Sequence, residues 1–295
     1  MNEKTANKVG LVLEGGTFRG VYSAGVMDAF LENGVEFPYI IGVSAGISNG
    51  VSYVSKQFAR NREIMDKYRS DKRYIGARNF RLCKSCFGLD FVFGEIPNKL
   101  VPFDYETFYS YKGELKVGVT NAETGKFECK NGLENGTDFK YLRASCSIPG
   151  LFPPAELDGK LYYDGGLSCP IPVKQAIKDG CTKNVLILTQ PEGFVKKCGK
   201  GNIIMSQLIR KKFPEIEMLL LDRHRIYNRQ TEFCRELERR GKALIFRPKI
   251  KLDSMEKSTE KLCETWQMGY DDGTARIEEV KAFIGKQYDM YDPKP

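Results

Sequence analysis

The chain has 295 residues, of which 41% are hydrophobic and 28% charged, a balance that is ordinary for a globular protein and excludes intrinsic disorder. No stretch approaches the roughly 18 uninterrupted apolar residues of a membrane-spanning helix, and residues 1–10 lack the apolar run of a signal peptide. The net charge of +8 suits anionic lipid as well as nucleic acid, but much of the basic excess, over 210–251, alternates with glutamates as on a solvated helix face. We therefore expect a cytoplasmic protein that binds no nucleic acid and contacts anionic membranes only peripherally.

The first fifty residues alternate between two kinds of apolar pattern. Residues 8–13 and 39–42 are apolar runs typical of buried strands, while 19–31 and 45–54 carry small and apolar residues at helical spacing. Strand, helix, strand and helix in this order predict an α/β fold with a parallel sheet and helices on its faces.

The rest of the chain continues this pattern less regularly. We expect strands at 115–121, 127–129, 161–163, 184–189 and 243–247, helices at 61–68, 139–145, 173–179, within 215–240 and across 256–283, and loops at 74–93, 148–154 and 196–201. There is no internal repeat and no low-complexity linker. A single domain over 1–295 is therefore the simpler organisation, with a core at about 8–250 and a C-terminal helical segment at about 255–285.

The nine cysteines have no regular spacing, which predicts reduced thiols and not a disulfide framework. Cys83 and Cys86 form one C-x-x-C pair, but no second pair offers the further ligands that a structural zinc site needs. We expect no metal and no other cofactor.

One serine lies in a sequence typical of a nucleophile. Gly42-Val43-Ser44-Ala45-Gly46 fits G-x-S-x-G and stands between a predicted strand and a predicted helix. A nucleophile elbow needs this context, because the sharp turn lifts the serine hydroxyl above the sheet and the flanking glycines leave room for the backbone. The helix that follows directs its positive end toward Ser44, which favours negative charge there. The alternative is a small-residue turn with an incidental serine.

A glycine-rich loop, which reads EGGTFRG over 14–20, joins the first predicted strand to the first helix. Its backbone N–H groups suit either an oxyanion or a phosphate. A phosphate- or nucleotide-binding module is the rival interpretation, but the spacing is G-G-x-x-x-G and not G-x-G-x-x-G, and the Lys-Ser/Thr end of a P-loop is missing. We favour an oxyanion hole.

A serine nucleophile needs a base, and two residues are candidates. His224 is the one histidine, and Ser44, Asp164 and His224 follow the chain order of an α/β-hydrolase triad. However, only two predicted strands precede Ser44, and His224 is flanked by arginines on a predicted helix. Asp164 follows the strand 161–163 and precedes Gly165 and Gly166, so its carboxylate can stand at the edge of the sheet. By itself, Asp-Gly-Gly is most often only a turn.

Together these motifs resemble the patatin-like phospholipase family, especially its bacterial soluble members. The family pattern has a G-G-G-x-R-G oxyanion loop, a G-x-S-x-G nucleophile and a D-G-G or D-G-A base, in that order. In this chain the first motif stands at 15–20, where Arg19 and Gly20 complete it, and the others stand at 42–46 and 164–166. Further similarity lies at 120–126, 144–154, 170–173 and 269–270.

The resemblance implies a three-layer α/β/α sandwich with a mostly parallel central sheet, and a Ser–Asp dyad that acts without metal. Ser44 would attack the acyl carbonyl while Asp164 takes its proton, and the N–H groups of Gly15, Gly16 and Thr17 would hold the oxyanion. An aspartate, with a pKa of about 3.9 in water, can act as the base only if its pKa is raised or its proton transfer is concerted with the attack.

The resemblance also implies hydrolysis of fatty-acyl esters in phospholipids, lysophospholipids or related lipids. An acyltransferase with the same dyad is the alternative. One departure is Thr17, which stands where the family has its third glycine, because a β-branched residue resists positive φ. The candidates for an acyl channel, with core packing as the alternative, are Phe87, Phe91, Phe93, Leu151 and Phe152.

Overall fold

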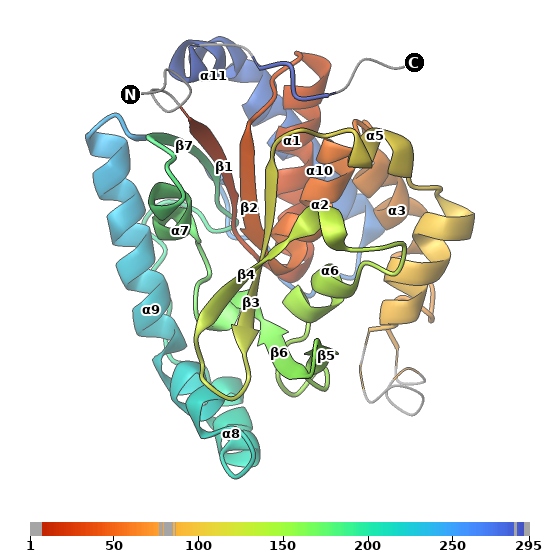
Figure 1. Ribbon diagram of the computed structural model, residues 1–295, viewed down its shortest axis with the longest axis vertical. Helices are drawn as coiled ribbons and strands as arrows, with labels where there is room; N and C mark the ends of the chain where they lie inside the picture. The colour runs from red at the N-terminus through yellow and green to blue at the C-terminus, as the bar shows by residue number, and fades with distance from the viewer. Residues whose placement is uncertain (1–7, 77–78, 80–84, 86, 286–287, 292–295) are drawn as a thin grey trace.

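An eight-stranded sheet runs through the centre of the protein in the computed structural model, which describes residues 8–76, 79, 85, 87–285 and 288–291 (Figure 1). In chain order the strands are β1 (Val9–Leu13), β2 (Tyr39–Val43), β3 (Glu114–Asn121), β4 (Phe127–Asn131), β5 (Ala155–Leu157), β6 (Lys160–Asp164), β7 (Lys183–Ile187) and β8 (Ala243–Phe246). Their order is β5-β6-β3-β2-β1-β7-β8, with β4 paired to β3. The pairs from β3 to β8 along this order are parallel, and those of β4, β5 and β6 are antiparallel.

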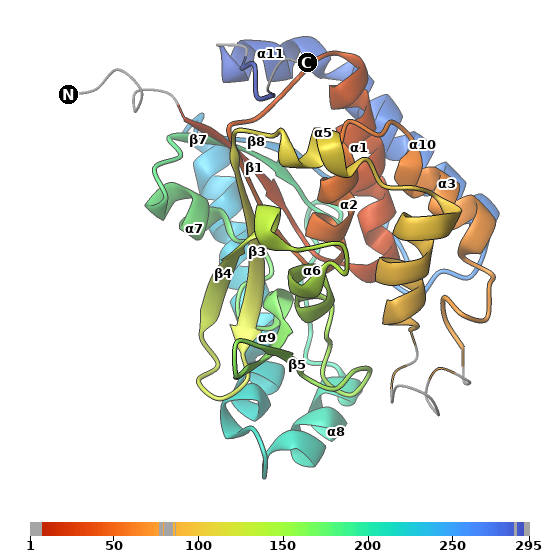
Figure 2. The same cartoon turned by 45° about the vertical axis from the view of Figure 1, so that its right-hand side comes forward.

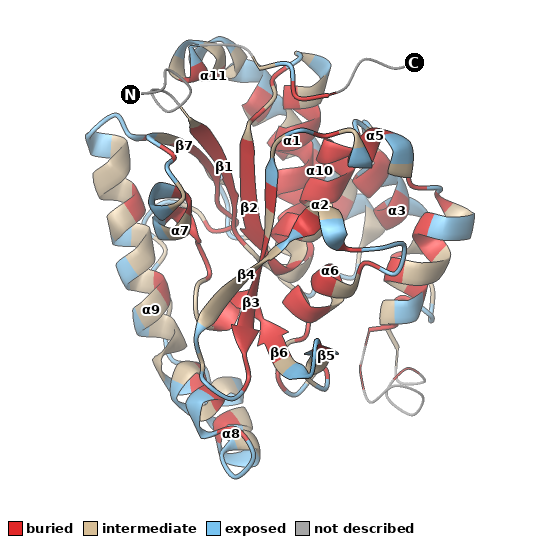
Figure 3. Ribbon diagram, viewed as in Figure 1, coloured by how far each residue is buried: buried red, intermediate tan, exposed pale blue. Residues whose placement is uncertain are grey.

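The central strands are apolar along their whole length because helices cover both of their faces. Every residue of β1 and β2 is buried (Figure 3). Val9, Leu11 and Leu13 of β1 belong to the core on the side of α1, whereas Val12 belongs to a second core on the opposite face. This alternation is the two-residue period of a strand, and burial on both faces is typical of parallel sheets.

Helices form a layer on each face of the sheet (Figures 1 and 2). One face carries α1 (Gly20–Glu32), α2 (Ser44–Val54) and α10 (Thr259–Ala275), and the other carries α7 (Val173–Lys178) and α9 (Pro214–Arg239). The remaining helices are α3 (Arg60–Tyr68), η3 (Phe91–Leu100), α5 (Tyr105–Tyr109), α6 (Lys140–Ser145), α8 (Lys200–Ile209) and α11 (Ile277–Ile284), with short turns η2 (Thr17–Arg19), η4 (Gly132–Glu134) and η5 (Gly165–Leu167). The predicted α/β/α sandwich is confirmed.

The C-terminal helix α10 packs closely on α1 because each helix has a glycine at the contact. A Cβ at Gly25 would lie 2.0 Å from the carbonyl oxygen of Trp266, and one at Gly269 would lie 2.0 Å from that of Tyr22. The indole Nε1–H of Trp266 donates to Asp28 in α1 (2.7 Å). The C-terminal segment is thus joined to the α/β core by backbone contact as well as by a buried hydrogen bond.

Two expectations about the elements are wrong, and one helix was not expected. The segment 74–93, expected as a loop, ends in η3, a wide π-type helix that contains Pro97. The loop expected at 196–201 is present up to residue 199, but helix α8 after it was not expected, because the glycines around its start conceal it. The helix expected across 256–283 is divided into α10 and α11 at Arg276, whose side chain donates to the carbonyl oxygen of Ile245 in β8 (2.7 Å).

The other expected elements lie within a few residues of those observed. Strand β5 was not expected. Cys83 and Cys86 lie outside the described residues. None of the helices that the structure describes is long and apolar enough to cross a membrane.

Candidate active site

Ser44 stands on a sharp turn where β2 passes directly into α2. Its φ of 53° lies in the left-handed region, which a side chain other than glycine adopts only at some cost in energy. The turn fits over β1 because Gly46 has no side chain: a Cβ there would lie 2.4 Å from the carbonyl oxygen of Glu14. A Cβ at Gly42 would lie 2.8 Å from the Cβ of Leu13. Both glycines of the motif are therefore required by packing against β1.

A second serine holds the backbone of this turn. The N–H of Ser44 donates to Oγ of Ser145 (2.8 Å), and the Ser145 hydroxyl donates to the carbonyl oxygen of Gly118 in β3 (2.7 Å). Ser145 is fully buried at the end of α6. Sequence reasoning gave this residue no role, because it is 101 positions from Ser44 and its only signal was the similarity over 144–154.

Asp164 ends β6 and is buried, with 3% of its surface exposed. Its Oδ1 accepts the N–H of Gly166 (2.7 Å), and its backbone carbonyl accepts the hydroxyl of Thr120 (2.8 Å). Gly165 lets the turn approach β3, since a Cβ there would lie 2.3 Å from the carbonyl oxygen of Gly118. Because β6 pairs with β3 and β3 pairs with β2, the ends of β2 and β6 meet at one edge of the sheet.

The structure brings Ser44 and Asp164 together. Burial raises the pKa of Asp164 above its usual 3.8, while the nearby Ser44 side chain, the N–H of Gly166 and the charge of Arg223 each lower it. Asp164 is therefore a desolvated carboxylate close to the Ser44 side chain. A carboxylate in this environment is a stronger base than one in water.

The glycine-rich loop lies against Ser44, since a Cβ at Gly15 would be 2.9 Å from the Cβ of Ser44. The N–H of Phe18 donates to the carbonyl oxygen of Ser254 (3.3 Å). In the part of the chain that the structure describes, the N–H groups of Gly15, Gly16 and Thr17 have no acceptor in the protein. Thr17 has a φ of 53°, so threonine does adopt the left-handed conformation at this position. The three amide groups are thus available to an anion beside Ser44.

The loop is anchored by Thr189, which follows β7. Its hydroxyl donates to the carbonyl oxygen of Gly15 (3.1 Å) and accepts from Nε of Arg19 (3.4 Å). Its N–H donates to the buried carboxylate of Glu14 (2.7 Å). Burial raises the pKa of Glu14, and the charge of Arg19 lowers it. Arg19 therefore helps to hold the shape of the loop. Sequence reasoning missed Thr189, because no local pattern marks a contact about 170 positions away.

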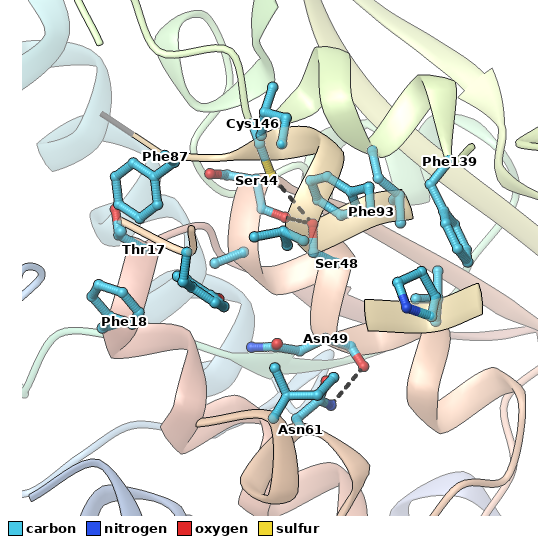
Figure 4. Close-up of a pocket in the computed structure, with 18 of the residues that line it drawn as sticks. Thr17, Phe18, Ser44, Ser48, Asn49, Asn61, Phe87, Phe93, Phe139 and Cys146 are labelled. Atoms are coloured by element: carbon cyan, nitrogen blue, oxygen red, sulfur yellow. Dashed lines mark hydrogen bonds between the residues drawn. The ribbon is translucent and has the colours of Figure 1, made fainter. Parts of the chain in front are cut away.

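An apolar cavity of about 140 Å³ opens beside Ser44 (Figure 4). Its walls come from α2, α3, η3 and α6, with the loop after α6. The aromatic lining residues are Phe18, Tyr74, Phe87, Phe93, Phe103, Phe139 and Phe152. Of the expected channel residues, Phe87, Phe93 and Phe152 line the cavity, whereas Phe91 and Leu151 do not and belong to the apolar cluster that also contains Trp266.

One basic side chain, Arg60, lines the same cavity and is 7% exposed. Its Nη2 donates to the carbonyl oxygen of Val101 (2.9 Å), its Nη1 donates to Oγ of Ser52 (3.3 Å), and its guanidinium lies 5.2 Å from the ring centre of Phe103. Burial lowers its pKa to about 10. Arg60 therefore stays protonated at neutral pH and ties α3 to the cavity wall.

Cys146 also lies beside the nucleophile, and its Sγ is 3.3 Å from Oγ of Ser48 (Figure 4). Burial raises the pKa of the Cys146 thiol to about 12. The thiol is therefore protonated at neutral pH and does not compete with the Ser44 hydroxyl as a nucleophile.

Arg223 and His224 are neighbours on α9, but only Arg223 interacts with the Ser44–Asp164 site. Burial lowers the pKa of Arg223, and the charge of Asp164 opposes this shift, which places the guanidinium in the field of the carboxylate. In the described residues no hydrogen bond joins His224 to Ser44 or Asp164, and His224 does not line the cavity. No group of three His, Cys, Asp or Glu residues in the described chain is placed to hold a metal ion.

Parts of the chain are similar to known proteins. Residues 11–177 match the family described as patatin-like phospholipase, and residues 213–285 match a domain of unknown function, DUF6363. The uncharacterized protein YjjU of Escherichia coli (strain K12) is 29% identical over 190 residues, which are 62% of this chain and 52% of that protein. Lysophospholipase nte1 of Aspergillus niger is 29% identical over 164 residues, 54% of this chain and 10% of that protein. The structure of VipD from Legionella pneumophila matches 92% of this chain and 67% of that chain, with 14% identity and a TM-score of 0.46.

The chain therefore spans about half the length of the first of these relatives and a tenth of the second. The family match includes the glycine-rich loop, the Ser44 turn and Asp164.

Proposed function

Because the chain belongs to the patatin-like phospholipase family, we propose that it hydrolyses fatty-acyl esters of lipids with Ser44 as the nucleophile and Asp164 as the base. The observation that carries the proposal is that the buried Asp164 lies close to Ser44, which lines an apolar cavity. Ser44 lines that cavity, whereas Asp164 does not. An acyl chain in the cavity would bring its carbonyl carbon to the hydroxyl while the carboxylate stays behind it.

In the first half of the reaction, Oγ of Ser44 forms a bond to the acyl carbon and its proton passes to the Asp164 carboxylate. The carbonyl oxygen becomes an oxyanion, which accepts from the N–H groups of Gly15, Gly16 and Thr17. Collapse of this intermediate breaks the ester bond. The alcohol leaves with the proton from Asp164, and the acyl group remains on Ser44.

In the second half, Asp164 takes a proton from water as the water oxygen attacks the acyl carbon. The second tetrahedral intermediate releases the fatty acid, and the proton returns to Oγ of Ser44. The raised pKa of Asp164 supports this role, because a base is most effective when its pKa approaches the working pH.

The substrate class follows from the cavity. Its wall is mostly aromatic and aliphatic, which suits a fatty-acyl chain and not a nucleotide or a sugar. Lysophospholipase nte1 carries this activity in its name, and we propose phospholipids or lysophospholipids as the esters that this chain cleaves. We further propose that the protein works in the cytoplasm and meets these lipids at the surface of anionic membranes.

The proposal is tested by following fatty-acid release from lysophosphatidylcholine and from a soluble nitrophenyl ester. Ser44→Ala and Asp164→Asn should each reduce both rates to near background, because one removes the nucleophile and the other the base. His224→Ala is the matched control and should keep most of the parent rate. Loss of activity in a folded His224→Ala protein, with Asp164→Asn still active, would support a histidine base and contradict the dyad.

Product analysis separates hydrolysis from acyl transfer. With lysolipid or a simple alcohol added, a hydrolase still releases mainly free fatty acid. If most of the acyl group appeared on the added acceptor, the protein would be an acyltransferase with the same dyad.

A further inference from the structure

Helix α8 protrudes from one end of the molecule in both views of the fold (Figures 1 and 2). It is the centre of residues 194–213, here called the α8 segment. This segment contains six basic residues and no Asp or Glu: Lys196, Lys197, Lys200, Arg210, Lys211 and Lys212. The segment is therefore a local concentration of positive charge.

The α8 segment also exposes large apolar side chains between its basic ends. Leu208 is 73% exposed, Val195 64% and Ile204 59%. Ile204 and Leu208 are four residues apart and share one face of α8. The inward face is covered, because Met205 and Ile209 pack against the buried cluster of Phe213 and its neighbours. The exposed apolar face is therefore additional to the one that holds α8 on the protein (Figure 3).

Through its inward face, helix α8 lies next to one wall of the cavity. The side chain of Met205 covers Gly150, where a Cβ would lie 1.9 Å from the Met205 Cε. Gly150 is in the loop after α6, whose residues Ile148 and Phe152 line the cavity beside Ser44. Anything that binds to α8 would thus lie close to this wall of the cavity.

We propose that the α8 segment binds the surface of an anionic lipid bilayer and so brings the cavity to its substrate. The proposal rests on the proposed function, which it extends by naming the surface that meets the membrane. Ile204, Leu208 and Val195 enter the boundary between headgroups and acyl chains, while the exposed lysines and Arg210 pair with anionic headgroups. The cations at both ends of α8 let the helix lie along the bilayer plane.

The combination of exposed apolar and basic side chains favours a bilayer over a nucleic acid or a second copy of this chain. A nucleic acid would be held by the basic residues alone, and exposed isoleucine and leucine would add nothing to its phosphates. A second copy of this chain would cover the apolar face but would bring the six basic residues of each copy together. An anionic bilayer satisfies both features at once.

Vesicle cosedimentation tests this inference, with Ser44→Ala present in every protein so that no lipid is consumed. The probes are vesicles of phosphatidylcholine and vesicles in which part of it is replaced by phosphatidylglycerol. One variant carries Ile204→Ser and Leu208→Ser, and another carries Lys197→Gln, Lys200→Gln and Lys211→Gln. The matched control carries Ile177→Ser and Lys178→Gln in α7, a helix that lies away from α8 and in which Ile177 is 38% exposed (Figures 1 and 2).

The starting protein should bind phosphatidylglycerol vesicles in preference to pure phosphatidylcholine, and added salt should weaken the binding. Each α8 variant should bind about tenfold more weakly or worse, and the lysine variant should also lose most of the salt dependence. The α7 control should bind like the starting protein. Melting curves identify any variant that fails to fold, and single substitutions of Leu208 or Lys200 then replace it.

Equal vesicle binding by all of these proteins would overturn the inference. It would also be overturned if the apolar variant changed only the monomer–dimer equilibrium, or if the lysine variant lost duplex DNA binding while vesicle binding persisted. Since binding is measured without hydrolysis, these outcomes leave the proposed reaction untouched. Conversely, an inactive parent protein that still binds vesicles through α8 would refute the reaction and not the docking surface.

Discussion

Two buried carboxylates, Asp164 at the end of β6 and Asp28 in α1, have similar burial but different neighbours. Each is 3% exposed, and burial raises the pKa of each, to about 6 for Asp28. Asp164 lies close to the side chain of Ser44, which lines the cavity, whereas Asp28 accepts from the indole of Trp266 between two packed helices. Burial alone can therefore raise a carboxyl pKa anywhere, and the group that the carboxylate touches separates a candidate base from a structural acceptor.

The largest expected difference between the two aspartates is in catalysis, when each is changed to asparagine. Asp164→Asn should lower kcat/KM for a soluble ester by about 1000-fold or more, because proton removal from Ser44 is lost. Asp28→Asn should leave kcat/KM within a few-fold of the parent, since Trp266 lies outside the cavity. Ester kinetics on both folded variants measure this, and similar losses in the two would contradict the distinction.

The next largest expected effect is the loss of stability when the α1–α10 contact is disturbed. Gly25→Ala or Gly269→Ala should cost about 3 kcal/mol or more of unfolding free energy, because each Cβ would meet a backbone oxygen that cannot move aside. Urea unfolding measures the change. Gly201→Ala in α8 is the control: a Cβ there has open space, and the better helix propensity of alanine should stabilise by up to about 1 kcal/mol. Unchanged stability in both α1–α10 variants would show that these helices separate easily.

The pH dependence of the unfolding free energy tests whether Asp28 is ionised while buried. The pKa of Asp28 is about 6 in the folded protein and 3.8 for an ordinary exposed aspartate, which stands for the unfolded chain. The folded state therefore favours the protonated form. Asp28 therefore costs stability at neutral pH, and this cost disappears as the pH falls from about 6 through 3.8. Asp28→Asn should exceed the parent by about 1–3 kcal/mol at pH 8 and match it below about pH 4. A constant difference across this pH range would exclude a buried ionised Asp28.

The smallest expected effect concerns the glycine-rich loop. Thr17→Gly removes the strain of a left-handed threonine, worth about 1–2 kcal/mol, but adds about 0.5–1 kcal/mol of backbone entropy in the unfolded chain. The protein should gain between about 0 and 1.5 kcal/mol, measured by urea unfolding. Thr17→Val keeps the β-branch and should show no such gain. Stabilisation of equal size in both would mean that strain at residue 17 is not the cause.

The parts of the fold that the sequence predicts well are those with local causes. The unbroken apolar runs of β1 and β2 follow from burial on both faces, and the turn at Ser44 follows from Gly42 and Gly46 between a strand and a helix. Its pairing with Asp164 required the family resemblance, because nothing near Asp164 distinguishes a base from a turn.

The parts that the sequence did not predict depend on contacts distant along the chain. Ser145 and Thr189 lie 101 and 174 positions from the backbone groups they hold, so no local pattern marks them. Helix α8 has glycines at its start and an exposed apolar face, which conceals the period of a buried helix. The break at Arg276 depends on its hydrogen bond to β8.

The central claim is that the Ser44 hydroxyl is made reactive by Asp164, and fluorophosphonate labelling followed by peptide mapping tests it without a choice of substrate. The label should be found on Ser44, and its rate should fall as the pH drops through the raised pKa of Asp164. Asp164→Asn should label slowly at every pH. Labelling elsewhere, or labelling of Ser44 at the same rate with and without the Asp164 carboxylate, would contradict the account.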